Sequence, residues 1–356
     1  MSRRLRFATY NVEWFNALFD DAGHLYDDGA WSSRRDVTRA DQTAALIAVF
    51  RALDADGITV IEAPDHNGRR STVRALEGFA ACAGLRARSA VIGFANDTQQ
   101  EIAFLYDPDR IAARHDPVGS PTADRAADEA PRFDGTFRID LDIDATLDTV
   151  RWSKPPLELA VEVAGGGALR LIAVHAKSKA PHGAATPEAI MRVSIANRRK
   201  QLAQCIWLRR RVAGHLARGE PLIVMGDFND GPGLDEYERL FGRSGVEIVI
   251  GGPGEPQLYD PHARAALSRR LGAAPSTARF YLAHEGRWLS ALLDYAMVSP
   301  ELAATRPRWR IWHPFDDAGC YRDRALREAL LTASDHYPVT VDLPVGTPNP
   351  AASDLS

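Results

Sequence analysis

The sequence predicts an α/β protein, and two features of the chain support this. Short runs of apolar and β-branched residues, such as 58–61 and 222–225, alternate with longer segments whose apolar residues recur at helical spacing, such as 194–217. The composition, with 45% hydrophobic and 25% charged residues, is that of an ordinary globular protein with enough apolar material for a sizeable core. We therefore expect buried strands covered by amphipathic helices.

In the first half of the chain, the pattern predicts strands separated by helices and loops. The expected strands cover residues 5–10, 58–61, 101–106, 157–163 and 169–174, and the expected helices cover 34–53 and 71–83. Three consecutive glycines at 165–167 predict a hairpin turn between the last two of these strands. Residues 115–130 are rich in Asp, Ala and Pro, which is typical of a surface loop.

The second half begins with the long helix at 194–217, followed by a buried strand at 222–225 that ends at Gly226. Further expected elements are a short helix at 235–241, an irregular segment or strand at 247–250, a Gly/Pro loop at 251–256, short strands at 279–282 and 288–289, and longer strands at 291–299 and 339–343. The length of 356 residues would ordinarily suggest two domains, but the chain shows no repeat and no internal linker.

Charge and cysteine usage limit the class of protein. The net charge is −4, so the chain lacks the overall basic field of non-specific nucleic-acid binders, and a polyanion would have to meet a local basic patch or metal ions. The three cysteines are scattered and form no zinc-binding spacing, which fits a reducing compartment. No signal peptide or membrane-spanning segment is evident, and we expect a cytoplasmic protein without membrane contact.

The segment 221–230 is the most informative stretch of the chain. Asp227, Asn229 and Asp230 directly follow a buried strand, at the point where a rigid backbone opens into a loop. Such a position suits functional side chains, because the strand holds the backbone in place. Gly, Asp and Asn are also the usual residues of turns, so this segment alone does not decide between a site and a turn.

Polar residues that could bind a metal or transfer a proton lie at or beside the ends of several predicted strands. The set comprises Asn11, Glu62, His175, Asp227, Asn229, Asp294, Asp335 and His336. Each member alone equally fits a turn or an exposed strand end, but together they suggest convergence on one edge of the fold. Carboxylate and amide oxygens suit Mg²⁺, Mn²⁺ or Ca²⁺, whereas zinc favours more His and Cys. Histidines beside such a cation suit phosphodiester cleavage.

These motifs resemble those of the endonuclease/exonuclease/phosphatase superfamily. The resemblance rests on Asn11-x-Glu, the strand-end Glu62, His175-x-Lys-Ser, Gly-Asp-Phe-Asn at 226–229, Leu-Asp-Tyr at 293–295 and Ser-Asp-His at 334–336. It implies the DNase I-like fold, a four-layer α/β sandwich in which two mixed β-sheets pack face to face with helices on the outside. It also implies one domain over residues 1–345. The segment 346–356 is rich in Pro, Ala and Ser, and we expect it to be a disordered tail.

The resemblance implies a metal site and a cation. Glu62 would be the main metal ligand, with Asn11 and Asp335 close to the ion. The cation would be Mg²⁺, or Mn²⁺ or Ca²⁺. Lys177, Lys179 and Lys154 are expected to contact the phosphate of the substrate.

The resemblance also assigns the catalytic side chains. Asp227 and Asn229 would orient or deprotonate the attacking water. His336 would stabilise the transition state, with its tautomer held by Asp294, and His175 would be the second histidine on the phosphate. Asp230 is then left as a turn residue.

Some features depart from the family pattern. Many members carry Gln before the metal-binding Glu, and the abasic-site nucleases carry a Lys shortly after it. Here Ile61 precedes Glu62 and Ala-Pro-Asp follows it, which counts against an abasic-site repair enzyme. The partner that orients His175 could be Thr98 or Gln100. The segments 152–156 and 279–281 are similar to those of a bacterial nuclease-type branch.

The function expected from the sequence is a divalent-metal-dependent phosphodiesterase, namely an endonuclease or exonuclease that hydrolyses nucleic acid by metal-assisted attack of water. One alternative is a phosphatase or phosphodiesterase that acts on a small or lipid phosphoester. An alternative of another class is a catalytically inactive member that only binds. The expected partner is nucleic acid or another phosphodiester, and no obligate protein partner is indicated.

Overall fold

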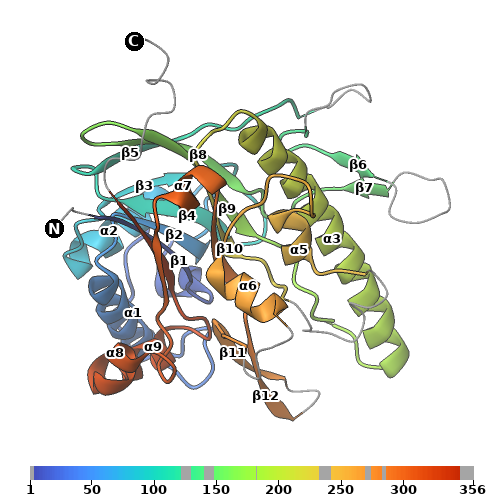
Figure 1. Ribbon diagram of the computed structural model, residues 1–356. Helices are drawn as coiled ribbons and strands as arrows, with labels where there is room; N and C mark the ends of the chain where they lie inside the picture. Colours follow the sequence, from blue (N-terminus) through green and yellow to red (C-terminus); the bar gives the residue numbers. More distant parts are fainter. Residues whose placement is uncertain are drawn as a thin grey trace.

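Helices and strands of the protein are arranged in four layers, and two β-sheets form the inner pair (Figure 1). The computed structural model describes residues 4–121, 130–139, 148–181, 183–231, 242–268, 274–282 and 286–344. In the view of Figure 1, α1, α2, α8 and α9 lie on one side of the sheets and α3, α5 and α6 lie on the other. The predicted four-layer α/β sandwich is therefore confirmed.

The first sheet has six strands in the order β14-β15-β1-β2-β4-β3. Its centre is β1 (Arg4–Asn11), which runs parallel to β2 (Gly57–Ala63) and antiparallel to β15 (Val339–Pro344). The other strands are β3 (Ser89–Ile92), β4 (Glu101–Tyr106) and β14 (Arg308–Ile311). Because β1 and β2 are parallel, their carboxyl ends meet at the same edge of the sheet.

The second sheet has five strands in the order β13-β10-β9-β8-β5. Here β9 (Ala168–His175) runs parallel to β10 (Leu222–Asp227), and β13 (Asp294–Val298) pairs antiparallel with β10. The remaining strands are β5 (Ile111–His115) and β8 (Leu157–Val163). Two separate hairpins pair β6 (Phe137–Ile139) with β7 (Asp148–Val150) and β11 (Ala278–Leu282) with β12 (Arg287–Ala291).

Each sheet packs one face against its own helices. The first sheet packs against α1 (Arg39–Leu53), α2 (Thr72–Ala83) and α9 (Arg324–Ala333), and the second packs against α3 (Pro187–Ala217), α5 (Gly245–Ile250) and α6 (Pro261–Leu267). Shorter helices are η1 (Phe15–Leu18), α7 (Pro300–Ala304) and α8 (Ala318–Arg322). None of the helices in the described ranges has both the length and the apolar character needed to cross a membrane.

The side chains between the two sheets alternate along each strand in the way that positions the site. In β1, Phe7 faces the inter-sheet core and Ala8 and Tyr10 face the helices. The same alternation puts Asn11, four residues after Phe7, on the inter-sheet side. The last residues of β9 and β10, His175 and Asp227, also follow inward-facing apolar residues. A polar layer therefore closes one end of an apolar core.

Several predicted element boundaries are wrong for a local reason. The helix expected at 34–53 begins only at Arg39, because the side chain of Thr38 caps its first turn. The helix expected at 194–217 begins earlier, at Pro187, with Thr186 as its cap. The segment 247–250 is helical rather than irregular or extended. Ser244 and Glu247 form a capping box there, and this short helix is buried against α3.

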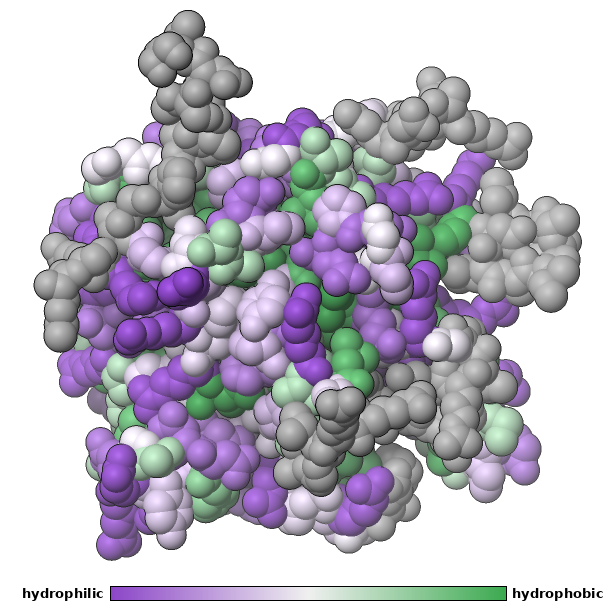
Figure 2. All heavy atoms as spheres, in the orientation of Figure 1, coloured by the Kyte–Doolittle hydropathy of each residue, from purple (hydrophilic) through white to green (hydrophobic). Residues whose placement is uncertain are grey.

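The stretch predicted as one strand at 291–299 is divided between β12 and β13. The strand pattern is continuous in sequence, but the chain leaves one hairpin at Ala291 and joins the second sheet only at Asp294. The predicted helix at 235–241 and the tail at 346–356 lie outside the described residues, as do parts of 115–130. Figure 2 shows one face of the molecule, where hydrophilic side chains dominate and hydrophobic ones form small separate groups.

Gly226 is required by the close approach of β9 and β10. Its φ is +136°, and a Cβ at this position would lie 2.0 Å from the carbonyl oxygen of Val174. We expect Gly226→Ala to lower the free energy of unfolding by about 3 kcal/mol, because backbone cannot move aside as a side chain can. Urea denaturation measures this loss.

The matched control is Gly165→Ala. Gly165 also has a positive φ, +94°, but a Cβ there meets nothing within 4 Å. Only the backbone strain remains, so Gly165→Ala should lower the free energy of unfolding by about 1 kcal/mol. Equal losses for the two variants would contradict the steric explanation.

Candidate active site

Three functional side chains lie in a row across the second sheet. Asp227, the last residue of β10, is the register partner of His175 on β9 and of Asp294 on β13. Cross-strand partners point to the same face of a sheet, so their side chains lie close together. The Nε2 atom of His175 is 3.7 Å from Oδ2 of Asp227. The structure thus brings together three of the residues predicted from the sequence.

Asp227 is a buried carboxyl group held by two amides. Its Oδ1 accepts the backbone N–H of Asn229 at 2.8 Å, and its Oδ2 accepts Nδ2 of Asn11 at 3.0 Å and Nδ2 of Asn229 at 3.2 Å. Burial raises the pKa of Asp227 to about 7, and the nearby Asp294 adds to the rise, while His336 and the hydrogen bonds oppose it. A carboxyl with this pKa can take up a proton near neutral pH.

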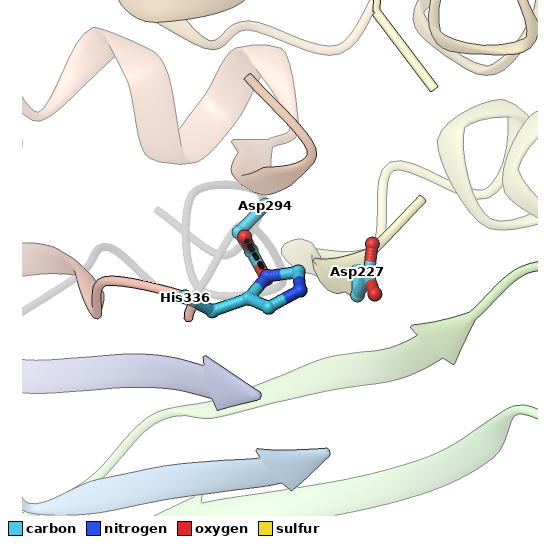
Figure 3. A group of neighbouring side chains, drawn as sticks. All are labelled: Asp227, Asp294 and His336. Atoms are coloured by element: carbon cyan, nitrogen blue, oxygen red, sulfur yellow. Dashed lines mark hydrogen bonds and ion pairs between the residues drawn. The ribbon is translucent and has the colours of Figure 1, made fainter. Parts of the chain in front are cut away.

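His336 and Asp294 form a hydrogen-bonded pair beside Asp227. The two residues are joined by a 2.8 Å hydrogen bond between Nδ1 of His336 and Oδ2 of Asp294. Figure 3 shows the imidazole between the two carboxylates, with its other nitrogen toward Asp227. Burial opposes a charge on His336, but Asp294, Asp227 and Asp335 outweigh it and hold the pKa of His336 well above its ordinary value. The ring is therefore a cation whose Nε2–H is available to a substrate.

Two hydroxyl groups hold this pair in place. The Oγ of Ser334 donates to the carbonyl of Asn11 at 2.8 Å and accepts the N–H of His336 at 3.0 Å. The Oγ1 of Thr277 accepts the N–H of Asp294 at 2.9 Å. Ser334 belongs to the predicted Ser-Asp-His motif, and its role there is to tie the His336 segment to the end of β1. Thr277 carried no signal in the sequence.

Glu62 reaches the site through a β-bulge. The register of β2 against β4 shifts between Ile61 and Ala63, and Glu62 has a φ of +62°. Its Oε2 accepts the backbone N–H of Trp14 at 2.8 Å, and its charge acts on Lys154. A left-handed conformation is costly for Glu, and such strain often occurs at functional sites.

Glu13 is a site residue that we did not single out in the sequence, although it ends the Asn11-x-Glu motif. Its N–H donates to Oδ1 of Asn11 at 3.1 Å, and its Oε2 accepts the N–H of Asp335 at 2.9 Å. Arg34 forms an ion pair with the same carboxylate. Burial and the nearby Asp335 raise the pKa of Glu13. Glu13 therefore links two of the predicted metal ligands.

His175 contacts the ammonium of Lys154 in addition to lying near the carboxylate of Asp227. The Nζ of Lys154 is 3.0 Å from Nε2 and 3.1 Å from Nδ1 of His175, and it donates to Oε1 of Gln100 at 2.7 Å. Burial, with Lys154 and His336, lowers the pKa of His175 well below its ordinary value. Burial also lowers the pKa of Lys154 to about 8. His175 is thus neutral beside a cation, and Gln100 contacts it only through Lys154.

The other two predicted lysines have different surroundings. The backbone N–H of Lys177 donates to Gln204 at 2.9 Å, and burial and then Lys200 lower the pKa of its ammonium. The Nζ of Lys179 is 2.6 Å from Oδ1 of Asp230. Their role as phosphate contacts stays a prediction.

The interpretation of Asp230 as a turn residue is incomplete. Asp230 is fully buried, and its Oδ1 also pairs with Arg198 at 2.7 Å. Its carboxylate therefore anchors the loop after β10 to α3, which sequence reasoning missed.

Two sets of side chains could hold a cation. In the described part of the chain, Asp227, Asp294 and His336 each offer a ligand atom within 4.8 Å of the others. The second set is the predicted one, with oxygen atoms from Glu62, Asn11 and Asp335. Asp294 and His336 already bind each other, and a protonated imidazole is no metal ligand. The all-oxygen set fits a hard cation better.

Comparisons with known proteins address the family and the fold. A family model described as the Endonuclease/Exonuclease/phosphatase family matches residues 8–336. Truncated Caenorhabditis elegans TDP2 is 14% identical with a TM-score of 0.49, covering 96% of this chain and 97% of that one. A family protein from Bacteroides thetaiotaomicron is 16% identical, with a TM-score of 0.49 and 96% and 98% coverage. The human Nocturnin catalytic domain is 14% identical, with a TM-score of 0.46 and 96% and 95% coverage. No curated protein matches the chain.

The charge of His336 depends on Asp294 in this geometry. We expect Asp294→Asn to lower the pKa of His336, because the amide keeps the shape of the carboxylate but removes its negative charge. The imidazole of the variant should then lose its proton at a lower pH than in the parent protein. An NMR titration of the histidines in the presence of a chelator measures the pKa of His336 in the variant and in the parent protein.

His313 is an internal control in the same titration. Its Nδ1 is 3.3 Å from a carboxylate oxygen of Asp316, so its pKa should not move in Asp294→Asn. An unchanged pKa of His336, or equal shifts of the two histidines, would contradict the assignment.

Proposed function

The chain belongs to the Endonuclease/Exonuclease/phosphatase family, and on that premise we propose that it is a divalent-metal-dependent phosphodiesterase that hydrolyses nucleic acid. The observation that carries this proposal is geometric: Asp227, Asp294 and His336 are buried with side-chain N and O atoms within 4.8 Å of one another, and Asp294 holds His336 by a 2.8 Å hydrogen bond. Asp227 is available as a base near neutral pH, while His336 stays a cation beside it. Opposite roles for neighbouring groups are what acid–base hydrolysis requires.

Glu62, Asn11 and Asp335 are the residues that would hold the cation. Their oxygens match the preference of Mg²⁺, Mn²⁺ and Ca²⁺, and Glu13 ties Asn11 to Asp335 through its backbone and side chain. When bound, the cation supplies positive charge to the phosphate oxygens. The identity of the ion is part of the proposal.

Asp227 orients the attacking water and accepts its proton. The hydrogen bonds from Asn11 and Asn229 hold its carboxylate in one orientation, so one lone pair remains for the water. The water oxygen forms a bond to phosphorus as the bond from phosphorus to the leaving oxygen breaks on the opposite side. Proton transfer to a carboxylate with a pKa of about 7 is favourable in this step.

Positive groups face the charge that builds on the phosphate. The Nε2–H of His336 donates to a non-bridging oxygen, and Asp294 keeps that ring charged and in one tautomer. His175 is neutral, so it contributes a hydrogen bond rather than a charge. Lys154, whose ammonium contacts the His175 ring, supplies a further positive charge.

Nucleic acid is the preferred substrate for two reasons. Lysines lie at one side of the site, and a groove with arginine and aromatic side chains opens beside Asp335. The alternative is a phosphatase or phosphodiesterase of small or lipid phosphoesters, which the acidic net charge favours. A catalytically inactive binding member would not need the intact set of acid, base and cation-binding groups. The bacterial nuclease-type branch and a cytoplasmic location remain part of this proposal.

A substrate panel tests the proposed function. The purified protein is incubated with Mg²⁺, Mn²⁺ or Ca²⁺ and with single-stranded DNA, plasmid DNA, RNA, a generic phosphodiester and phosphomonoesters. We expect nucleic acid to be cleaved and a chelator to stop the cleavage. Preference for a phosphomonoester would support the alternative, and no hydrolysis with any metal would support an inactive binding protein.

We expect Asp227→Ala and His336→Ala each to lower kcat by 10³-fold or more, in the range of about 4 kcal/mol, without loss of the fold. The first change removes the base and the second removes the cation that faces the phosphate. Initial rates with a generic phosphodiester, together with circular dichroism, measure the two effects.

His215→Ala is the matched control. His215 is also buried and bonded to a carboxylate, that of Glu220, but it lies on α3 outside the site. This variant should keep its kcat. Substantial residual hydrolysis in Asp227→Ala or His336→Ala would overturn the assignment.

The pKa shifts predict a bell-shaped pH profile. The rate should rise with pH up to about 7, as Asp227 loses its proton, and a bound cation would move this limb to lower pH. It should fall again only well above pH 6.5, when His336 becomes neutral. The profile of kcat/KM for a small phosphodiester measures both limbs. A rate that falls between pH 6 and 7 would contradict the roles of both groups.

A further inference from the structure

A groove of about 510 Å³ adjoins the site on the side of Asp335. Glu13 and Asp335 line it next to the proposed cation ligands, and Tyr281 and Trp288 line it from the β11–β12 hairpin. None of the catalytic steps above uses the hairpin. The groove therefore offers space for a part of the substrate that does not react.

Main-chain hydrogen bonds attach this hairpin to the catalytic segment. The N–H of Arg279 donates to the carbonyl of Asp335 at 2.7 Å, and the N–H of Tyr337 donates to the carbonyl of Thr277 at 2.6 Å. The side chain of Thr277 also accepts from Asp294, as described above. The base of the hairpin is consequently held at a set position relative to His336.

The hairpin exposes two aromatic rings on one of its faces. Tyr281 and Trp288 are direct cross-strand partners, and they are 41% and 58% exposed. Their ring centroids are 5.6 Å apart. Large aromatic side chains seldom remain this exposed as a pair without a partner to cover them.

Arginine side chains accompany each of the two rings. The guanidinium of Arg279 lies 5.3 Å from the centroid of Trp288, and that of Arg35 lies 5.6 Å from the centroid of Tyr281. Arg35 also pairs with Asp36, but both side chains are exposed, so that pair contributes little. Aromatic rings with adjacent arginines match the bases and phosphates of a nucleic-acid strand.

We propose that the groove binds an unpaired nucleotide next to the scissile phosphate, with its base stacked on Trp288 and Tyr281 and its phosphate near Arg35 or Arg279. This inference rests on the proposed function, and it specifies the substrate as single-stranded nucleic acid or a single-stranded end. Bases inside a duplex are already stacked on one another and cannot reach exposed rings. A lipid chain would instead need a wider apolar surface without arginines.

Binding measured in a chelator tests the groove separately from catalysis. Trp288→Ala and Tyr281→Ala are compared with the parent protein by fluorescence anisotropy, using a single-stranded oligonucleotide and a second one of equal length that lacks its bases. We expect each variant to bind the complete oligonucleotide about 5- to 50-fold more weakly, as for the loss of one stacked base. Binding of the base-free strand should not change.

Tyr321→Ala is the control for the loss of an exposed aromatic ring. Tyr321 is 53% exposed and carries Arg327 at 5.1 Å from its centroid, but it lies on α8 and does not line the groove. The Tyr321→Ala variant should bind both oligonucleotides with the affinity of the parent protein. Equal losses for both strands in the groove variants, or no loss for either, would overturn the inference.

Kinetics separate this inference from the proposed function. In the groove variants, KM for the complete oligonucleotide should rise while kcat and the hydrolysis of a small phosphodiester stay unchanged. An unchanged KM for the complete oligonucleotide in the groove variants would refute the groove assignment but would not contradict the phosphodiesterase activity. Base-dependent binding by a protein that hydrolyses no phosphoester would refute the proposed function and leave the groove assignment intact.

Discussion

The site depends on one geometric constraint, the common end of two parallel strand pairs. In the first sheet β1 and β2 finish together, and in the second sheet β9 and β10 do so. Since the sheets pack face to face, the inward side chains at these ends lie between the two layers. Most inter-sheet positions are apolar along the strands, with Thr9 and Thr59 as exceptions, and the strand ends carry Asn11, His175 and Asp227. The packed apolar side chains next to the strand ends thus hold the polar side chains in fixed positions.

Burying two carboxyl groups side by side is unfavourable unless their surroundings compensate for it. The Oδ2 of Asp294 is paired with the charged imidazole of His336. Burial raises the pKa of Asp227 to about 7, although the hydrogen bonds from its amide partners oppose the rise. The two neighbouring carboxyl groups therefore differ in their partners, which are a charged imidazole for Asp294 and neutral amides for Asp227. In the proposed reaction, this difference makes Asp227 the base and Asp294 the group that supports His336.

The strand ends were predictable from sequence because a buried apolar run followed by a polar residue is a local pattern. That pattern singled out Asp227, whereas Asp294 and His336 were singled out by the Leu-Asp-Tyr and Ser-Asp-His motifs; the three side chains meet in space. The contacts that hold them were not predictable, because they join distant segments, as Thr277 does for Asp294. The buried ion pair of Asp230 was missed for the same reason. The helix at 245–250 was misjudged since its apolar residues read equally well as strand or helix.

The arrangement separates chemistry from substrate selection. The acid–base groups sit on or directly beside strands of the two main sheets, where the packed core limits their movement. Trp288 and Tyr281 lie on a two-stranded hairpin whose base is hydrogen-bonded to the segment at 335–337. Changes to the exposed rings can therefore alter what is bound without disturbing Asp227 or His336. Family membership rests on the family model that matches residues 8–336, whereas the hairpin is our proposal for the element that selects the substrate.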